Sequence, residues 1–279
     1  MKRKILGISD SRPPGRSLSN SEAIHILESF DLSDEEIEEP YGLEGYYIFY
    51  KKGSKFIRCY RDDYSACLKI STELQDRLSF FGLAPKVLDE ITFKGIYTNV
   101  SEYLKPTTSQ VNNVKLKQNI GELHHAISSI LNEWEVGRSI IESTTHSMHS
   151  MLKEYSISLF DTYDIRSNII SEFYEVFKWI KQTDNYGHGD MHPGNILQDQ
   201  DKYVFIDYES VFQSKGGADL DFYNLNRFDV CLNKKSGRSR KIESYLYVKS
   251  AIVNHYLEDI GKYVSLQERQ KFLQKICRP

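Results

Sequence analysis

The feature that most constrains this chain is a turn-rich polar loop, Gly187 to Asn195, followed by two short apolar runs. The runs are Ile196-Leu197 and Tyr203 to Ile206, and they predict a small hairpin within residues 195–211. Asp190 lies in the loop, Asn195 follows five positions later, and Asp207 comes at the end of the second run. The pattern therefore predicts three polar side chains held beside a short hairpin.

These three residues match what phosphoryl transfer from ATP requires. One carboxylate must orient the attacking hydroxyl and accept its proton, which we assign to Asp190. An amide oxygen and a second carboxylate must hold Mg²⁺ against the phosphates, which predicts Asn195 and Asp207 as metal ligands.

Histidines near the loop suggest a different chemistry. His188 and His192 flank Asp190 in a spacing that could serve a transition metal. No other His or Cys cluster in the sequence supplies further ligands, so we favour the phosphoryl-transfer interpretation. His146 and His149 lie three residues apart, and a helix explains them without a metal.

Two motifs, HGDMHPGNIL (188–197) and FIDYE (205–209), resemble those of the aminoglycoside phosphotransferase and choline kinase superfamily. This is the small-molecule branch of the protein-kinase-like fold. Weaker similarities extend over about residues 45–225: FIRCYR (56–61), the segment from Glu73 to Pro85, IGELH (120–124) and GADL (217–220). The resemblance implies an α+β, bilobal protein-kinase-like fold, with a β-rich N-lobe containing one main helix and a mostly helical C-lobe.

The resemblance also implies roles for residues of the nucleotide site. Arg58 stands where the family usually has a phosphate-binding lysine, and a guanidinium can hold phosphates bidentately. By the same resemblance Glu73 would pair with Arg58. The residues implied around adenine are Glu102, Tyr103 and Leu104 at the hinge and Leu197 and Ile206 as the floor.

Three further residues near the motifs receive supporting roles from the resemblance. His188 would be a buried histidine that braces the loop. Asp219 would anchor the loop through backbone N–H groups, and Glu209 would lie behind the metal ligands or touch the substrate. One segment departs from the family pattern: Tyr41 to Gly45 is not a GxGxxG loop over the nucleotide.

The order of periodic segments predicts a β-rich front and a helical back. Residues 1–40 form a lead-in with a short helix near 19–30, residues 41–105 form the N-lobe, and residues 106–279 form the helical C-lobe. The expected strands are Gly45–Tyr50, Lys55–Tyr60, Val87–Leu88 and Gly95–Leu104, and the expected helices are Tyr64–Phe81, Lys115–Leu131 and Ile165–Lys181.

Composition narrows the class of protein. The chain has 279 residues, 40% of them apolar and 27% charged, which is typical of a folded globular protein and excludes a disordered or collagen-like chain. No apolar run approaches the length of a membrane span, and the basic N-terminus lacks the apolar core of a secretory signal. The four cysteines show no CxxC spacing, which indicates reduced thiols and a cytoplasmic location.

Charge is distributed unevenly along the chain. Counting Lys and Arg against Asp and Glu gives 15 − 17 = −2 for residues 1–105, 10 − 18 = −8 for 106–230 and 11 − 4 = +7 for 231–279. The acidic middle predicts an amine-bearing acceptor such as an aminoglycoside or a choline-like compound. The basic stretch 234–241 is interpreted as an exposed loop, and an anion or nucleic acid is its alternative ligand.

The function expected from these observations is transfer of the γ-phosphoryl group of ATP, with Mg²⁺, to a hydroxyl of a small molecule. GTP remains open as the donor. Two alternatives stay open at this point: a kinase that acts on a protein or peptide, and a nucleotide-binding interaction protein without turnover.

Overall fold

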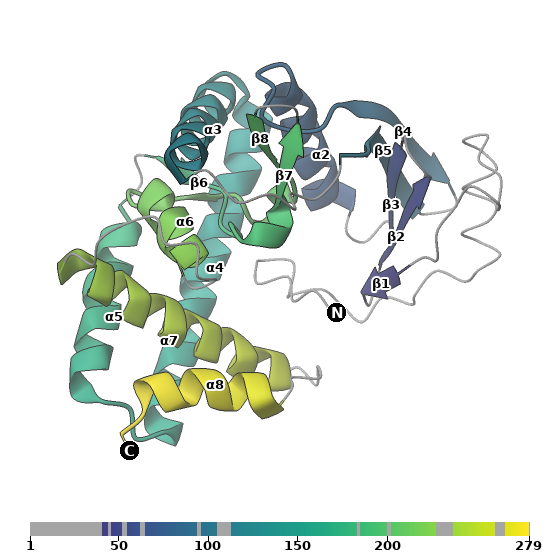
Figure 1. Cartoon of the computed structure of the whole chain (residues 1–279). Coiled ribbons are helices and arrows are strands. Elements are labelled where there is room, and N and C mark those ends of the chain that lie inside the picture. Colours follow the sequence, from purple (N-terminus) through teal and green to yellow (C-terminus); the bar gives the residue numbers. More distant parts are fainter. Residues whose placement is uncertain are drawn as a thin grey trace. The chain divides into compact units, whose positions relative to one another are not determined.

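The computed structural model describes residues 41–43, 46–51, 55–61, 65–93, 96–104, 113–182, 185–199, 202–226, 237–259 and 266–278 (Figure 1). These residues divide into two compact units. The described residues up to Leu104 together with 194–209 form a β-rich unit, and those of 113–193 and from Ser210 onward form a helical unit. The division assigns the predicted hairpin to the β-rich unit, whereas the sequence boundary placed it in the C-lobe.

The β-rich unit contains a five-stranded antiparallel sheet in the order β1-β2-β3-β5-β4. Its elements are β1 (Tyr41–Leu43), β2 (Tyr46–Lys51), β3 (Lys55–Arg61), α2 (Ser65–Ser79), β4 (Val87–Phe93) and β5 (Ile96–Glu102). The predicted strands and the helix of this region are therefore confirmed, with ends that differ by a few residues.

The core of this unit forms where α2 packs against the sheet. Leu74 and Leu78, one turn apart on α2, are fully buried, as are Ile57 of β3 and its register partner Val100 of β5. The helix ends because Gly82 adopts a φ of +65°, which is accessible to glycine at little cost. The chain then turns through Pro85 into β4.

The predicted hairpin is confirmed as β7 (Ile196–Asp199) and β8 (Lys202–Phe205). Two hydrogen bonds tie it to the exit of α2: the Phe205 N–H donates to the Leu83 carbonyl at 2.9 Å, and the Tyr208 hydroxyl donates to the same oxygen at 3.1 Å. These bonds to Leu83 fix the end of β8 within the β-rich unit, and the chain continues to Asp207 from there.

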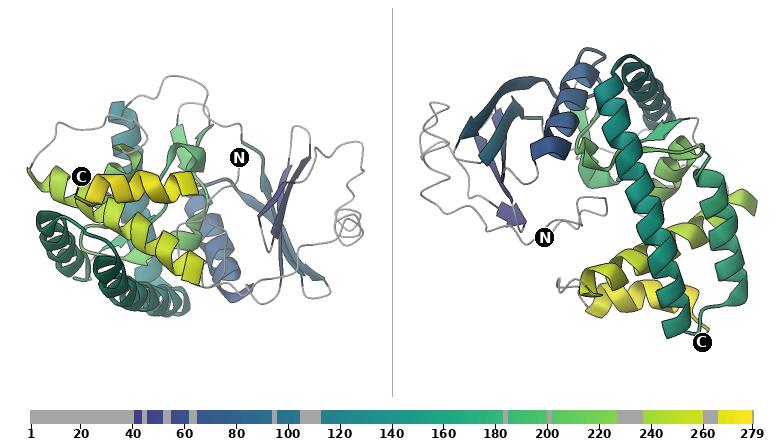
Figure 2. Two further views of the ribbon diagram at one scale, coloured as in Figure 1. Left: turned by 90° about the horizontal axis from the view of Figure 1, so that it is seen from below. Right: turned by 180° about the vertical axis from the view of Figure 1, so that it is seen from behind.

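The helical unit is built around a layer of aromatic side chains. Phe173 stacks on Phe177 and on Tyr245, with ring centroids 5.6 Å and 5.4 Å apart. α7 packs against α4, α5 and α8 (Figure 2). The elements of this unit are α3 (Asn113–Glu133), α4 (Glu135–Thr162), α5 (Ser167–Ile180), β6 (Tyr186–Gly187), β9 (Phe212–Gln213), α6 (Gly217–Asn226), α7 (Gly237–Asp259) and α8 (Leu266–Ile276).

The 28-residue helix α4 was not among the helices named from the sequence. Its apolar positions are diluted by Ser, Thr, His and Met, which weakens the helical periodicity. Several of its hydroxyls are satisfied within the helix, because Thr144 and Thr145 donate to the carbonyls of Ile140 and Ile141. Packing against neighbouring helices therefore stabilises a segment whose own pattern is weak.

Some sequence predictions concern residues that lie outside the described ranges. These are the lead-in with its short helix within residues 1–40, residues 44–45 of the covering loop, and residues 234–236 of the basic stretch. The described parts of the last two segments differ from the predicted loops, because 41–43 form strand β1 and 237–241 begin helix α7. Within the described ranges, no helix is both long and apolar enough to cross a bilayer.

Candidate active site

The loop that carries Asp190 begins at a fixed two-stranded ladder in the helical unit. β6 pairs with β9, Tyr186 opposite Gln213 and Gly187 opposite Phe212. The Gln213 N–H in turn donates to Oγ1 of Thr145 on α4, at 3.0 Å. The loop therefore leaves an anchored strand, and its next residues His188 and Asp190 are both buried.

Asp221 of α6 holds the start of this loop. Its carboxylate accepts hydrogen bonds from the N–H of His188 at 2.6 Å, the N–H of Gly189 at 3.0 Å and Nε2 of His124 at 2.8 Å. Only 1% of Asp221 is exposed. Backbone donors and an imidazole thus compensate a buried carboxylate and determine the path of the chain towards Asp190.

The prediction that Asp219 anchors this loop was wrong by two positions. Asp219 is exposed in the first turn of α6. Residues two apart on an α-helix point about 200° away from each other, so only Asp221 faces the loop. The motif around His124 was noticed in the sequence, but its link to Asp221 spans 97 residues and has no local signal.

Replacing Asp221 by alanine is expected to lower the free energy of unfolding by at least about 2 kcal/mol. The change leaves two backbone N–H groups and one imidazole nitrogen buried without this acceptor, and each such loss costs about 1–3 kcal/mol. Asp219→Ala is the matched control on the same helix and is expected to cost less than about 1 kcal/mol. Urea denaturation of both variants tests this, and equal stabilities would contradict the anchoring role.

Gly189 makes the turn before Asp190 possible. Its φ is +86°, and a Cβ at this position would overlap the carbonyl oxygen of Ser210. Both features require glycine, because other residues avoid this conformation and here also lack the space.

We expect Gly189→Ala to destabilise the protein by more than about 2 kcal/mol, from the left-handed backbone and the overlap together. Gly121→Ala is a control that should change the stability in the opposite direction. Gly121 is an exposed position in α3, and a methyl group added there would meet nothing within 4 Å. That change should stabilise the protein by about 0.5–1 kcal/mol, since alanine favours helix. Thermal unfolding of the two variants should give shifts in opposite directions.

His188 is a buried histidine of this loop, as the sequence resemblance implied. It is fully buried, and its Nδ1 is 3.4 Å from the Asp190 N–H, which donates to it. His192 lies on the other side, with Nε2 3.7 Å from the Asp190 carboxylate. Among the described residues no group of three or more His, Cys, Asp or Glu could hold a metal ion.

A second group of site residues lies in the β-rich unit and is organised by Arg58. One nitrogen of its guanidinium, Nη2, donates to Asp207 at 2.8 Å and to Glu209 at 2.7 Å. All three side chains are largely buried. The single positive charge of Arg58 offsets part of the repulsion between the two carboxylates.

The predicted pair of Arg58 with Glu73 was wrong. The structure joins Arg58 to Asp207 and Glu209, and it joins Glu73 to Arg77 at 2.6 Å, one turn along α2. The local pair forms because residues four apart on a helix are neighbours. Glu73 is also about half exposed, which leaves it in the environment of an ordinary surface ion pair.

Asp207 has the backbone strain that marks a functional position. Its φ of +73° makes it the one non-glycine residue with a positive φ among the described residues. The N–H of Ile206 donates to the Asn195 carbonyl at 3.1 Å, so the backbones that carry Asn195 and Asp207 are joined. Both side chains are buried in the β-rich unit.

The donor set of Asn195 and Asp207 fits Mg²⁺. An amide oxygen and a carboxylate are hard oxygen ligands, and Mg²⁺ is commonly held by one or two carboxylates together with substrate phosphates. The Arg58 guanidinium contacts Asp207 Oδ1 at 2.8 Å, so a metal at Asp207 would have to share this carboxylate with Arg58.

The residues predicted around adenine all lie in the β-rich unit. Glu102 ends β5 and is exposed, with Oε2 accepting from the Lys86 N–H at 3.3 Å. Tyr103 and Leu104 follow it and are half-buried. Leu197 of β7 is buried and Ile206 is half-buried. Contact with a nucleotide stays a prediction for all five.

Comparison with solved structures identifies the fold. An aminoglycoside 2′-phosphotransferase-IIIa mutant in complex with GDP matches with a TM-score of 0.63 at 13% identity, over 91% of this chain and 95% of that one. A macrolide 2′-phosphotransferase from Brachybacterium faecium matches with a TM-score of 0.61 at 11% identity, over 93% and 98%. The chain has the protein-kinase-like fold of these small-molecule phosphotransferases. Amicoumacin kinase, in complex with AMP-PNP and Ca²⁺, also matches, with a TM-score of 0.57 at 13% identity over 92% and 95%.

The likeness is one of structure rather than of sequence. No protein-family model matches the chain, and no curated protein matches it either. The sequence prediction of an α+β protein-kinase-like fold is confirmed by the structural matches, which cover nearly the whole chain. At identities of 11–15%, these matches do not show which substrate this chain uses.

Proposed function

We propose that this protein transfers the γ-phosphoryl group of ATP to a hydroxyl group of a small molecule. The observation that carries the proposal is the strained, buried Asp207, whose neighbour Ile206 is bonded to the backbone of the buried amide Asn195. A strained backbone conformation costs free energy and is found mainly at functional sites. A site for a nucleotide and its metal ion would account for it here. The fold similarity to small-molecule phosphotransferases supports the same reaction class.

Asp190 is the residue to which we give the acid–base role. It would orient the acceptor hydroxyl and accept its proton as the bond to phosphorus forms. Asp221 and His188 keep the loop in one conformation, which reduces the entropy lost when the acceptor is positioned. Only four residues separate Asp190 from Asn195 in the sequence.

Asn195 and Asp207 would hold Mg²⁺, and Arg58 would hold phosphate oxygens. The metal, when bound, neutralises charge on the phosphates and polarises the group that is transferred. Arg58 now bonds to Asp207 and Glu209, and a fork of N–H donors on this residue suits phosphate as well as carboxylate. Glu209 would keep the guanidinium at the site when Asp207 binds metal.

The donor is taken as ATP, and GTP is the alternative. Structures similar to this one were solved with ADP, with GDP and with AMP-PNP and Ca²⁺. Two of these neighbours were solved with streptomycin or kanamycin, which are ligands of those proteins. The amine-bearing acceptor predicted from the acidic middle of the sequence stays a prediction.

A screen of hydroxylated small molecules for consumption of ATP by the pure protein tests the proposal. We expect at least one acceptor class to raise ADP formation in a way that depends on Mg²⁺. Nucleotide binding without turnover on any small molecule or peptide would instead favour a non-catalytic interaction protein. Turnover with peptides alone would favour a protein kinase.

A further inference from the structure

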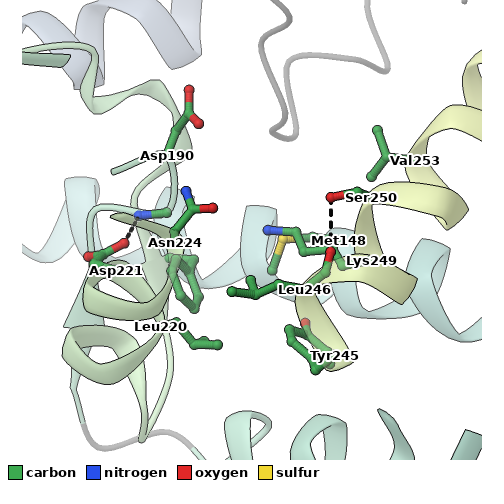
Figure 3. A pocket seen from close by; sticks show the side chains of 12 residues that line it. Met148, Asp190, Leu220, Asp221, Asn224, Tyr245, Leu246, Lys249, Ser250 and Val253 are labelled. Carbon is green, nitrogen blue, oxygen red and sulfur yellow. Dashed lines mark hydrogen bonds between the residues drawn. The ribbon is translucent and has the colours of Figure 1, made fainter. Parts of the chain in front are cut away.

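A pocket in the helical unit lies beside the residue to which we give the acid–base role. Gly189, Asp190 and α6 line one side of it, and α7 lines the other (Figure 3). Its apolar surface comes from both sides and from α4 and β9: Met148, Phe212, Leu220, Leu246 and Val253. The pocket has only about 30 Å³ of space, enough for about one or two water molecules, so a small group of a ligand can enter it while the body of the ligand lies outside.

The charges that line this pocket are few. Asp190 and Asp221 are its carboxylates, and Lys249 of α7 is the one Lys or Arg among its described lining residues. Asp221 already accepts three hydrogen bonds that hold the loop, and Asp190 is assigned to the acceptor hydroxyl. No further carboxylate among the described lining residues is left to bind an ammonium group of an acceptor.

The side chain of Lys249 lines this pocket and can contact a ligand bound in it. Its amine points from α7 towards the side that carries Asn224 and Asp190 (Figure 3). His149, beside Met148 on α4, adds no cation at neutral pH, because burial lowers the pKa of its imidazole to about 4. The nearby cations Lys181 and Lys249 lower that pKa further.

The acidic residues that led to the expectation of a cationic acceptor lie elsewhere. None of the nine helical carboxylates on which that expectation depended is among the pocket's lining residues. Glu122, Glu133, Glu135, Glu142 and Glu154 are exposed, as are Asp161 and Asp164. Glu172 accepts from Ser244 at 2.6 Å, and Glu175 pairs with Lys241. The negative charge of this segment is therefore a property of the helix surfaces.

We propose that Lys249 binds an anionic group of the acceptor, so that the substrate is an alcohol that carries a carboxylate or phosphate group. The inference rests on the proposed function, because it concerns the acceptor of that reaction. An anionic acceptor must approach the phosphates of ATP against charge repulsion, and an ammonium in the pocket offsets this. An amine-bearing acceptor would instead meet Lys249 as a like charge.

The test compares acceptors that differ only in charge. The probes are leucic acid, its primary amide, the amine 1-amino-4-methylpentan-2-ol, and the 1-phosphate of 4-methylpentane-1,2-diol, which share the same C2 hydroxyl. Each is assayed for ADP formation with the full-length chain. We expect kcat/KM to be highest for the carboxylate or the phosphate ester, and the comparison of these two identifies the preferred anion. In Lys249→Met this preference should fall about ten- to hundred-fold, the range for loss of one charge-assisted hydrogen bond.

Two further variants separate charge from structure. Lys249→Arg keeps the positive charge and should restore most of the preference for the anion. Lys241→Met removes an exposed lysine of the same helix, paired with Glu175, and should leave every acceptor unchanged. Activity with the neutral amide serves as the internal reference in each variant, because a folding defect would lower it as well.

Outcomes that overturn the inference differ from those that overturn the proposed function. Preference of the wild-type chain for the amine 1-amino-4-methylpentan-2-ol, or equal losses for all probes in Lys249→Met, would contradict the role of Lys249. Should no probe be phosphorylated, calorimetry of leucic acid binding decides. Weaker binding to Lys249→Met than to the wild-type chain would keep the anion site while counting against the reaction. Equal or absent binding would contradict the anion site itself.

Discussion

Replacing Asp190 by asparagine should lower kcat at least ~10²-fold, the lower end of the range for acid–base groups. The substitution keeps the shape of the side chain and its place on the buried loop, so His188 and Asp221 can still hold the backbone. It removes the carboxylate that accepts the proton. The affinity for nucleotide should stay within about two- to three-fold of the wild-type value, since we assign nucleotide binding to other residues.

The measurement is steady-state turnover on an acceptor identified by the screen, together with calorimetry of ATP binding. Asp161→Asn, on the exposed surface of α4, is the matched control and should retain full activity. Near-native turnover in Asp190→Asn would show that this carboxylate has no part in the chemistry.

Replacing Asp207 by alanine should weaken Mg²⁺-dependent binding of ATP at least ~10²-fold. Loss of a residue that only hydrogen-bonds to a metal ligand typically costs ~10- to 100-fold in metal affinity, and loss of a ligand itself should cost more. The reason is the loss of the one carboxylate in the donor set, which leaves the amide of Asn195. The fold should survive, because Glu209 still pairs with the buried guanidinium of Arg58.

Calorimetry of ATP binding with and without Mg²⁺ gives the result directly. In the wild-type chain the metal should strengthen binding, and in Asp207→Ala it should have little effect. Asp89→Ala, an exposed position of β4, provides a control in the same unit. Equal affinity of the Asp207 variant and the wild-type chain for the metal–nucleotide complex would remove Asp207 from the site.

The parts of the site that the sequence predicted are those encoded locally. Asp190, Asn195 and Asp207 lie within 18 residues, and the two short apolar runs between them predict the hairpin β7–β8. The strands β2 and β3 have equally local signals. Only residues 52–54 separate them in the sequence, and this short separation limits the pairing registers available to the two strands.

The parts that the sequence analysis missed depend on contacts between distant segments. Arg58 meets Asp207 across 149 residues, and a helical neighbour four positions away binds Glu73 instead. The choice between Asp219 and Asp221 depends on which face of α6 meets the loop. The charge of the pocket depends in the same way on which side chains face inward, and counting charges along the chain does not show which acidic residues line it.

The fate of the γ-phosphoryl group tests the central claim most directly. ATP labelled at the γ-phosphate is incubated with Mg²⁺, the full-length chain and the acceptors of the screen, and the labelled products are separated. The proposed function predicts label in an acid-stable phosphate ester of a small molecule, formed by the wild-type chain and at least ~10²-fold more slowly by Asp190→Asn. Label found only in protein, only in inorganic phosphate, or only in unreacted ATP would contradict it.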